Sequence, residues 1–440
     1  MKLAASYFIS GIFLFYLFSG EFFNVLLSGF IPEHKLASLV NQTVLFSCLT
    51  YTLFIAAFNH RKFIDVALSN FLMIVALSWL SFSYFWALYP EFTARRIIGE
   101  WLVLIFVISL ATQLKTPMNY FKPIFFVTLL IVFINLVWII IFNSDSFAQD
   151  GYFKGIFFHK NHAGTMFSIL SIIVLCSCAI YTRTFIRTAM LLITFIFCIV
   201  LMILAGSKTN YGLYAVVGIL YILIFVMYKL KYFSLSALTI TSVSVILAGW
   251  SVLFFMNVNL PDIFAALTGD PTLTGRTAIW AALLDLISQR PFLGIGWGSL
   301  WDVGENLNPL PTGYEPWIYN AKVIKSGHNT YIDIWAQAGF VSLLLVIFIN
   351  LRCVWVCFCL LNSSNPRFDE KVIVFCNLFV MTFIIFNGLT ESLLFRPSSG
   401  PGRLFIYMYV FNEFWWLAVR AENRRGSDRT KGATANQALA

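Results

Sequence analysis

The sequence predicts an all-α integral membrane protein with about twelve transmembrane helices and a large, partly helical loop on the outer side. Hydrophobic residues make up 60% of the 440 residues and charged residues only 11%, against about a quarter charged residues in a soluble globular domain. Several apolar stretches reach the roughly 20 residues that a helix needs to cross about 30 Å of hydrocarbon. Because backbone polar groups need internal partners inside a bilayer, a helical bundle is the expected architecture.

The apolar spans divide the chain into three parts and a tail. Residues 1–256 hold nine predicted transmembrane helices, residues 257–328 form the outer loop, and residues 329–419 hold three more helices. Short loops that carry Lys and Arg place both termini in the cytoplasm under the positive-inside rule. Residues 420–440 are predicted to be a disordered, basic cytoplasmic tail. The twelve expected spans are 5–30, 36–58, 63–87, 97–113, 123–143, 163–182, 188–205, 210–228, 233–256, 329–350, 372–389 and 404–419.

Clusters of basic residues lie at the outer junctions, where the positive-inside rule disfavours them. Each cluster also lies near a predicted helix N-terminus, and the helix dipole disfavours cations there as well. Cations held against two preferences indicate a bound anion with several charges, for which a lipid-linked pyrophosphate is the natural candidate. The clusters are Arg95-Arg96, His159-Lys160-Asn161-His162, Ser207-Lys208-Thr209, Gly275-Arg276-Thr277 and Ser326-Gly327-His328-Asn329.

The outer loop contains a predicted amphipathic helix over Thr274–Gln289. Its apolar positions recur at helical spacing and form one face, and Pro291 ends it. Loops this long are usually functional when they have structure of their own. The face comprises Ile279, Trp280, Leu283, Leu284 and Ile287.

His328 is the strongest candidate for a catalytic base. It lies at the first turn of an inward-running helix, where the dipole and nearby cations both favour the neutral imidazole, which can accept a proton from a hydroxyl. The alternative is an interfacial histidine bonded to a loop carbonyl. Arg276, Lys208 and Lys160 are predicted to bind a diphosphate, Arg276 through two parallel N–H bonds. A loop-pinning or snorkelling role for Arg276 stays open.

Several residues are accessory candidates. Asn329, His159 and Asn161 flank the main candidates, and Glu391 is either an accessory base or the ion-pair partner of Arg396. No carboxylate adjoins the paired histidines, so neither a metal nor another cofactor is expected. The remaining accessory candidates, Arg95 and Arg96, could equally pair with Glu91 or bind lipid head groups.

With these motifs in this order, the chain resembles the O-antigen ligase and polymerase superfamily. The resemblance covers roughly residues 150–400, and the HKN and SKT motifs are most similar to exopolysaccharide polymerisation proteins of the succinoglycan type. Lys208 stands where many members have arginine, and Ser342 where ligases commonly have a second glycine after Gly339. The motifs that carry the resemblance are residues 155–161, 207–209, 275–280 and 290–296, and His328-Asn329 followed by Gly339.

The resemblance implies a GT-C-like membrane glycosyltransferase in the bacterial inner membrane, with its active face in the periplasm. An undecaprenyl-diphosphate-linked glycan would be the donor, with His328 as base and Arg276 as pyrophosphate ligand. The two departures favour a polymerase that elongates another lipid-linked repeat unit over a ligase that uses lipid A-core or protein as acceptor. Expected partners are the acceptor glycan, the lipid bilayer, and chain-length regulator and flippase proteins, but no nucleic acid. The non-enzyme alternative is a transporter or flippase, although the polar residues gather at one face and no internal repeat is evident.

Overall fold

The computed structural model describes residues 2–19, 33–148, 150–157, 159–181, 184–229, 275–304, 309–320, 324–363 and 367–438. Within these ranges all regular secondary structure is helical apart from one isolated bridge between Phe147 and Phe153. The all-α prediction is therefore confirmed for this part of the chain. The elements are α1 (Lys2–Phe18), α3 (Glu33–Ser69), α4 (Phe71–Phe82), η1 (Ser83–Trp86), α5 (Pro90–Gln113), α6 (Pro117–Ile141), η2 (Ser144–Ser146), α7 (Lys160–Tyr181), α8 (Phe185–Leu204), α9 (Lys208–Lys229), α12 (Arg276–Gln289), η3 (Pro316–Tyr319), α13 (Thr330–Leu361), α14 (Phe368–Asn387) and α15 (Gly400–Ala438).

Five of the described helices, α6, α7, α8, α9 and α13, are long and apolar enough to cross a membrane. A sixth span results if the bent pair 57–69 and 71–86 is counted as one, although its two halves meet at 78°. The protein is thus a multi-pass membrane protein, while the predicted number of twelve spans is not confirmed. The expected span 63–87 is broken at Asn70, and the expected span 233–256 lies outside the described residues.

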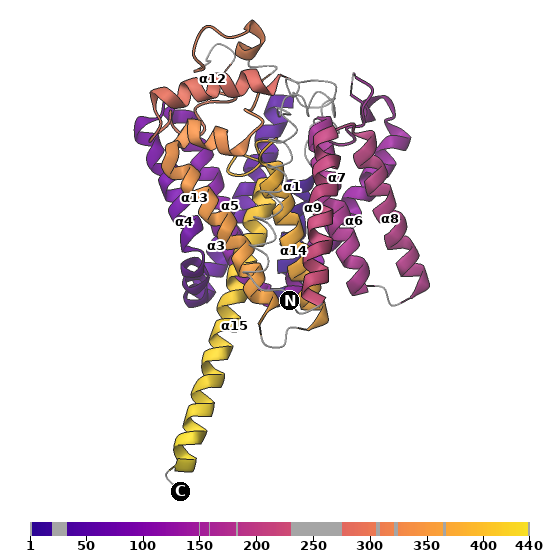
Figure 1. Ribbon diagram of the computed structural model, residues 1–440, viewed down its shortest axis with the longest axis vertical. Helices are drawn as coiled ribbons and strands as arrows, with labels where there is room; N and C mark the ends of the chain where they lie inside the picture. The colour runs from indigo at the N-terminus through magenta and orange to yellow at the C-terminus, as the bar shows by residue number, and fades with distance from the viewer. Residues whose placement is uncertain are drawn as a thin grey trace, which may run out of the picture.

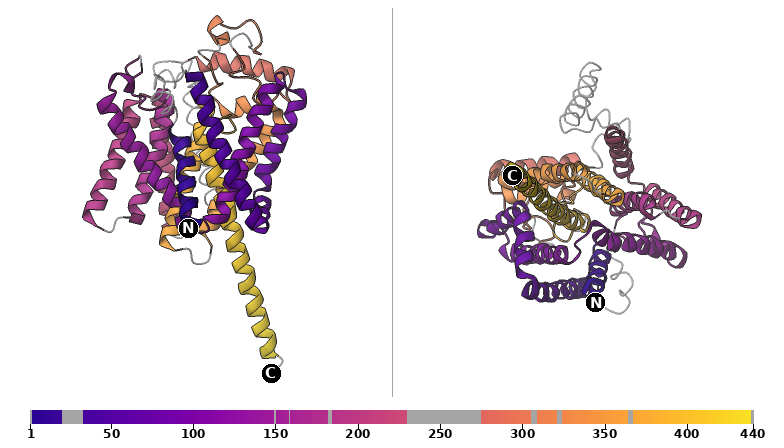
Figure 2. Two further views of the ribbon diagram at one scale, coloured as in Figure 1. Left: turned by 180° about the vertical axis from the view of Figure 1, so that it is seen from behind. Right: turned by 90° about the horizontal axis from the view of Figure 1, so that it is seen from below.

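The helices form a bundle with α12 lying across one end (Figure 1). The two termini lie towards the opposite end, where α15 projects well beyond the other helices. Viewed from behind, α6, α7 and α8 lie on one side of the bundle and α3, α4 and α5 on the other (Figure 2). We call the two ends the α12 end and the tail end.

The last residues of the chain differ from the prediction, because α15 continues as a helix to Ala438. The expectation of a disordered tail over 420–440 rested on its charge. However, the segment follows a helix that is already formed, so that it avoids the unfavourable nucleation step. It also contains five Ala and four Arg and no proline, and Ala and Arg favour helix.

Helix α13 contains a break that joins it to the glycine-rich segment after α12. Gly339 has φ 79° and ψ 178°, a conformation that only glycine adopts without strain. The break frees backbone carbonyls, and the amide groups of Ile295 and Gly296 donate to those of Ala336 and Gln337 at 3.2 and 2.8 Å. The segment 291–298 is therefore held against α13 by main-chain hydrogen bonds, and this close approach of two backbones accounts for its glycines.

Two ion pairs connect α15 to the bundle at different depths. Near the α12 end, Arg403 pairs with Glu100 of α5 at 2.6 Å, and the amide of Ser398 donates to the same carboxylate at 3.2 Å. Nearer the tail end, Arg352 of α13 forks onto Glu413 at 2.6 and 2.9 Å. Because breaking one partner of a buried pair leaves an uncompensated charge, these pairs fix where the segment between α14 and α15 lies.

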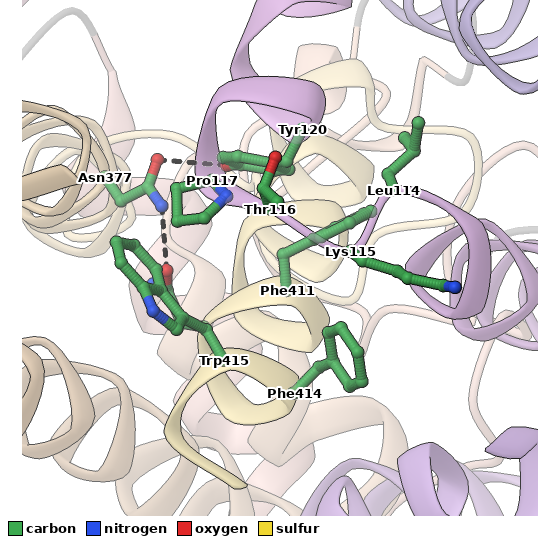
Figure 3. Close-up of a pocket in the computed structure, with 10 residues that line it drawn as sticks. Leu114, Lys115, Thr116, Pro117, Tyr120, Asn377, Phe411, Phe414 and Trp415 are labelled. Atoms are coloured by element: carbon green, nitrogen blue, oxygen red, sulfur yellow. Dashed lines mark hydrogen bonds between the residues drawn. The ribbon is translucent and has the colours of Figure 1, made fainter. Parts of the chain in front are cut away.

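A small hollow lies at the tail end, between α6, α14 and α15 (Figure 3). Its volume is about 10 Å³, which is about what one water molecule needs. One dashed line in Figure 3 marks the hydrogen bond that Tyr120 donates to Asn377, and Asn377 in turn donates to Asn412. This hollow is too small for a substrate, and the residues that line it serve helix packing.

Candidate active site

The carboxylate of Glu391 gathers three of the predicted site residues at the α12 end. Arg276 Nη2 lies 2.6 Å from Glu391 Oε1, and Asn161 Nδ2 donates to the same oxygen at 3.0 Å. His328 Nδ1 lies 2.9 Å from the other oxygen, Oε2. The three residues come from α12, the start of α7 and the start of α13, so one carboxylate joins segments that are far apart in the sequence.

The loop that carries Glu391 is itself tied to the first turn of α13. Thr330 Oγ1 donates to the carbonyl of Glu391 at 3.1 Å and accepts from the amide of Leu393 at 2.8 Å. The amide of Thr330 donates to Gly388 O at 2.7 Å. Because buried backbone groups need partners, this reciprocal bonding fixes Glu391 relative to His328.

His328 is held in a left-handed backbone conformation, with φ 49°, which is uncommon for a residue with a side chain. Both of its neighbours are pinned. The amide of Gly327 donates to both carboxylate oxygens of Asp333 at 3.1 and 3.2 Å, and the amide of Asn329 donates to Ser392 Oγ at 3.2 Å. Backbone strain of this kind persists only where the surroundings enforce it, and here it directs the imidazole at Glu391.

Asp333 acts on this turn without contacting the histidine ring. It accepts hydrogen bonds from Trp301 Nε1 at 2.9 Å and from Ser392 Oγ, in addition to the Gly327 amide. A Cβ at Gly327 would lie 2.5 Å from Asp333 Oδ1 and 2.6 Å from Leu283 Cδ1. The turn therefore requires glycine for space, and its glycine leaves the amide free to reach the carboxylate.

Electrostatics keeps Glu391 ionised. Its side chain is only 12% exposed, and this burial would raise its pKa, but the hydrogen bond from His328 and the charges of His328, Arg276 and Arg396 lower the pKa below its ordinary value. An ionised carboxylate only accepts hydrogen bonds, so a neutral His328 carries its proton on Nδ1. Its Nε2 is then left with a lone pair that can take a proton.

Arg276 occupies the first position of α12, where Gly275 with φ 79° precedes it. Its side chain is 9% exposed, so the guanidinium is largely withdrawn from bulk water while one N–H group bonds Glu391. The helix predicted over Thr274–Gln289 is present as α12, which begins at Arg276 and ends at Gln289 as predicted. On that helix Ile279, Leu283 and Ile287 are buried, whereas Leu284 is 49% exposed and is not part of the packed face.

A network of buried amides joins α7, α9 and α14 directly below the cluster. Asn387 Nδ2 donates to Asn210 Oδ1 at 2.8 Å, and Asn210 Nδ2 donates to the carbonyl of Asn161 at 2.9 Å and to Ser207 Oγ at 2.8 Å. Lys208 is the first residue of α9 and is exposed. Asn210 is bonded to the helix that carries Asn161 and to Ser207. The network therefore fixes the start of α9, and with it the backbone of Lys208, near the cluster.

The side chain of Lys160 is directed away from Glu391. Its ammonium lies 2.6 Å from Asp150 Oδ2 and 4.1 Å from the centroid of the Tyr152 ring. Its charge still acts on the neighbouring His159. Burial is the main cause that lowers the pKa of His159, Glu391 raises this pKa, and the charge of Lys160 lowers it further. His159 itself caps α7, with Nδ1 accepting from the amide of Asn161 at 3.2 Å.

The other accessory candidates have structural positions. Asn329 caps α13, its Oδ1 accepting from the amides of Tyr331 and Ile332 at 3.0 and 3.1 Å. Arg96 donates to the carbonyls of Gly298, Trp301 and Asp302, so that it anchors the loop after α12. Arg95 is exposed on α5. Arg396, one of the partners considered for Glu391, donates to the carbonyl of Lys325 at 3.2 Å.

Sequence reasoning missed the residues that hold the segments of the site in place through hydrogen bonds. Asn210, Asn387, Thr330 and Ser392 were not singled out, although Asn210 and Asn387 are polar residues inside apolar spans. Polar residues in such positions are costly and are usually functional or paired, and this signal could have found them. Among the residues that the structure describes, no three His, Cys, Asp or Glu side chains are grouped so as to hold a metal ion.

Two similarities to known proteins agree with this geometry. Residues 170–347 match the family model described as O-Antigen ligase, which is less than half of the chain. A segment of 131 residues is 26% identical to the exopolysaccharide production protein ExoQ of Rhizobium meliloti (strain 1021). That alignment covers 29% of this chain and 29% of the relative. Residues 170–347 are thus similar to the O-antigen ligase family, and the predicted resemblance to that superfamily is confirmed.

Proposed function

We propose that this protein is a polysaccharide polymerase of the bacterial inner membrane. It transfers a glycan from an undecaprenyl-diphosphate carrier to a sugar hydroxyl of another lipid-linked repeat unit at the periplasmic face, without a metal ion. The observation that carries the proposal is the Glu391 carboxylate, which binds Arg276 through Oε1 and His328 through Oε2. Glu391 thereby holds a proton acceptor, His328, close to a cation, Arg276.

The reaction that fits this arrangement is a displacement at the anomeric carbon. The acceptor hydroxyl gives its proton to His328 Nε2 as its oxygen forms the new glycosidic bond. The bond between the anomeric carbon and the diphosphate oxygen breaks, and the diphosphate leaves with the electron pair. Glu391 stabilises the imidazolium that forms, as a carboxylate partner does for other catalytic histidines.

The departing diphosphate needs cations, and the α12 end supplies them. Arg276 and Lys208 both begin helices, so the free amide groups of these helix ends add to their positive charge. Fixed charges of this kind, aimed where negative charge develops, are usually the largest contribution to catalysis. Lys160 is held by Asp150, and we assign it a weaker, long-range contribution.

The choice between polymerase and ligase concerns the acceptor. The matched family model is described as O-Antigen ligase, whereas the ExoQ relative is named for exopolysaccharide production. Ser342 stands where the ligases of the family that the chain resembles commonly have a second glycine, and this departure favours the polymerase. Its hydroxyl donates to the carbonyls of Gly339 and Ile334 at 2.6 and 3.2 Å, and a glycine there would leave these buried carbonyls without that donor.

Composition analysis of the glycans in a deletion strain separates these two activities. A strain without the polymerase accumulates single lipid-linked repeat units. A strain without a ligase accumulates long lipid-linked chains that are not attached to their final acceptor. The second result would assign the protein to the ligase class.

A variant pair tests the chemistry. His328→Ala should abolish polymer while the protein stays in the membrane, because no other group replaces the proton acceptor. His60→Ala is the matched control, since His60 is exposed in α3, away from Glu391. Wild-type polymer from His328→Ala would exclude the assigned mechanism.

A second pair tests diphosphate binding. Arg276→Lys keeps the charge but removes the planar fork, and an Arg-to-Lys change is not conservative at such a site. Arg352→Lys makes the same change at the ion pair near the tail end. Turnover in reconstituted membranes should fall for Arg276→Lys only, and equal activity in both variants would contradict the assigned role of Arg276.

A further inference from the structure

A polar cavity lies beside the cluster of Glu391, His328 and Arg276, separated from it by the first turn of α13. Its volume is about 220 Å³. The walls come from the start of α5, the loop after α12, helix α13 and the segment 392–398. The residues that matter for its chemistry are Arg96, Trp301, Asp302, Asp333, Gln337 and Arg396.

The size of the cavity suits one sugar ring. A water molecule needs about 10–15 Å³ measured in the same way, so this space is larger by an order of magnitude. A pyranose ring with its hydroxyl groups has about a dozen non-hydrogen atoms, and a space of this order accommodates a group of that size. The hollow at the tail end, at about 10 Å³, does not.

The lining selects a neutral, hydroxyl-rich ligand. Arg96 and Arg396 bring positive charge to the wall, and Asp302 and Asp333 bring carboxylates. Because the two signs are balanced, the wall has no net preference for an ion of either sign. A sugar hydroxyl both donates and accepts hydrogen bonds, so it can use both kinds of group, and the Trp301 indole offers an aromatic face.

The walls are held in place before any ligand binds. Arg96 is fixed by three loop carbonyls, and Gln337 accepts from the amide of Gly298 at 2.9 Å. Trp301 is fixed by its bond to Asp333. A preformed site of this kind loses little conformational entropy on binding.

The position of the cavity indicates which substrate it serves. Its lining residue Ser392 directly follows Glu391, and Thr330 lies two residues after His328. The elements that carry Arg276, Asn161 and Lys208, namely α12, α7 and α9, contribute nothing to its lining. The cavity thus lies on the other side of the first turn of α13 from His328, and apart from the cations that we assign to the diphosphate.

We propose that this cavity binds one pyranose ring of the acceptor glycan and so positions the neighbouring sugar, whose hydroxyl reacts, at His328. The inference rests on the proposed polymerase function and adds the site that selects the acceptor sugar. The donor diphosphate would then occupy the cationic side of Glu391, and the acceptor the side of α13 and α5.

Filling the cavity tests the proposal. Ile334 is buried in its wall, and Ile334→Phe adds a ring to the space where the sugar would lie. Ile347→Phe is the matched control, because Ile347 lies on the same helix and is 39% exposed. The KM for the acceptor should rise about tenfold or more in Ile334→Phe, in line with the effect of small steric changes in substrate pockets, while kcat changes little.

Binding is measured separately from turnover. The probe is the oligosaccharide released by mild acid from the lipid-linked glycans of the deletion strain, and the readout is saturation-transfer NMR with the purified full chain in nanodiscs. The signal should persist in His328→Ala and disappear in Ile334→Phe. If Ile334→Phe does not reach the membrane, Leu394→Phe fills the cavity from the opposite wall.

The outcomes separate this inference from the function on which it rests. Unchanged KM and unchanged saturation transfer in the filled variant would overturn it and leave the cavity to water alone. Polymer from His328→Ala would instead refute the polymerase mechanism, while the NMR signal would still report whether the cavity binds a saccharide.

Discussion

Replacing Glu391 by glutamine tests whether one carboxylate organises the site. The substitution keeps the size of the side chain but removes its charge. The amide can still meet Asn161, yet it no longer compensates Arg276, whose side chain is 9% exposed, nor an imidazolium at His328. Both effects follow directly from the two oxygens of the carboxylate and their partners.

The expected loss of activity is large. General base catalysis by a positioned histidine contributes about 100- to 10,000-fold, and Glu391 sets both the tautomer and the orientation of His328. A loss in that range corresponds to about 2.7–5.5 kcal/mol in the activation free energy. Removing one partner of a buried ion pair also lowers the free energy of unfolding, here by about 3 kcal/mol.

Glu413→Gln separates catalysis from stability. Glu413 is also buried, its side chain being 3% exposed, and it pairs with Arg352 at 2.6 Å nearer the tail end. Both variants should lower the thermal unfolding midpoint in nanodiscs. Only Glu391→Gln should lower kcat in an assay with isolated lipid-linked repeat units. Equal kcat values for the two variants, after correction for folded protein, would refute the reasoning.

Three further predictions follow from the same contacts. Because the folded-state pKa of Glu391 lies below its ordinary value of 4.5, its stabilising contribution is complete above pH 4.5 and is lost as the pH falls through the folded-state pKa. The difference in unfolding midpoint between wild type and Glu391→Gln should therefore shrink below pH 4.5, and a constant difference would contradict an ionised Glu391. Gly327→Ala should reduce turnover strongly, because its Cβ would lie 2.5 Å from Asp333 Oδ1 and overpacking costs about 1–3 kcal/mol; wild-type turnover would show that the turn can shift freely. Lys160→Met should lower polymer yield much less than Lys208→Met, since Lys160 is bound to Asp150. The reverse order in a polymer gel would show that Lys160, and not Lys208, binds the diphosphate.

Individual residues show how far the sequence predicts the site. Arg276, His328, Asn161 and Glu391 were all named as candidates from their position at helix ends, and the structure brings them together. Of the two roles left open for Glu391, the ion pair with Arg396 is not formed: the carboxylate pairs with Arg276, which is distant in sequence, whereas Arg396 donates to the carbonyl of Lys325. Nearness along the chain does not determine which cation reaches a carboxylate in a bundle.

The roles of Asn329 and Arg96 were also beyond sequence reasoning. Both are polar residues beside charged motifs, and both serve the backbone, Asn329 as a helix cap and Arg96 as an anchor for loop carbonyls. A cap and a substrate contact use the same residue types. Only the positions of the surrounding amide and carbonyl groups distinguish them.

The sequence by itself determined that this is a helical membrane protein with basic clusters at one end, because composition and hydrophobic length depend on local chemistry alone. It also determined that an amphipathic helix precedes Pro291, since periodicity is a local property, whereas the start of α12 at Arg276 came from the structure. Only the tertiary structure decided that Glu391 lies between Arg276 and His328 and that a cavity lined by Ser392 and Thr330 lies beside this cluster. These contacts join residues 63 to 230 positions apart, and their pairing depends on how the helices pack.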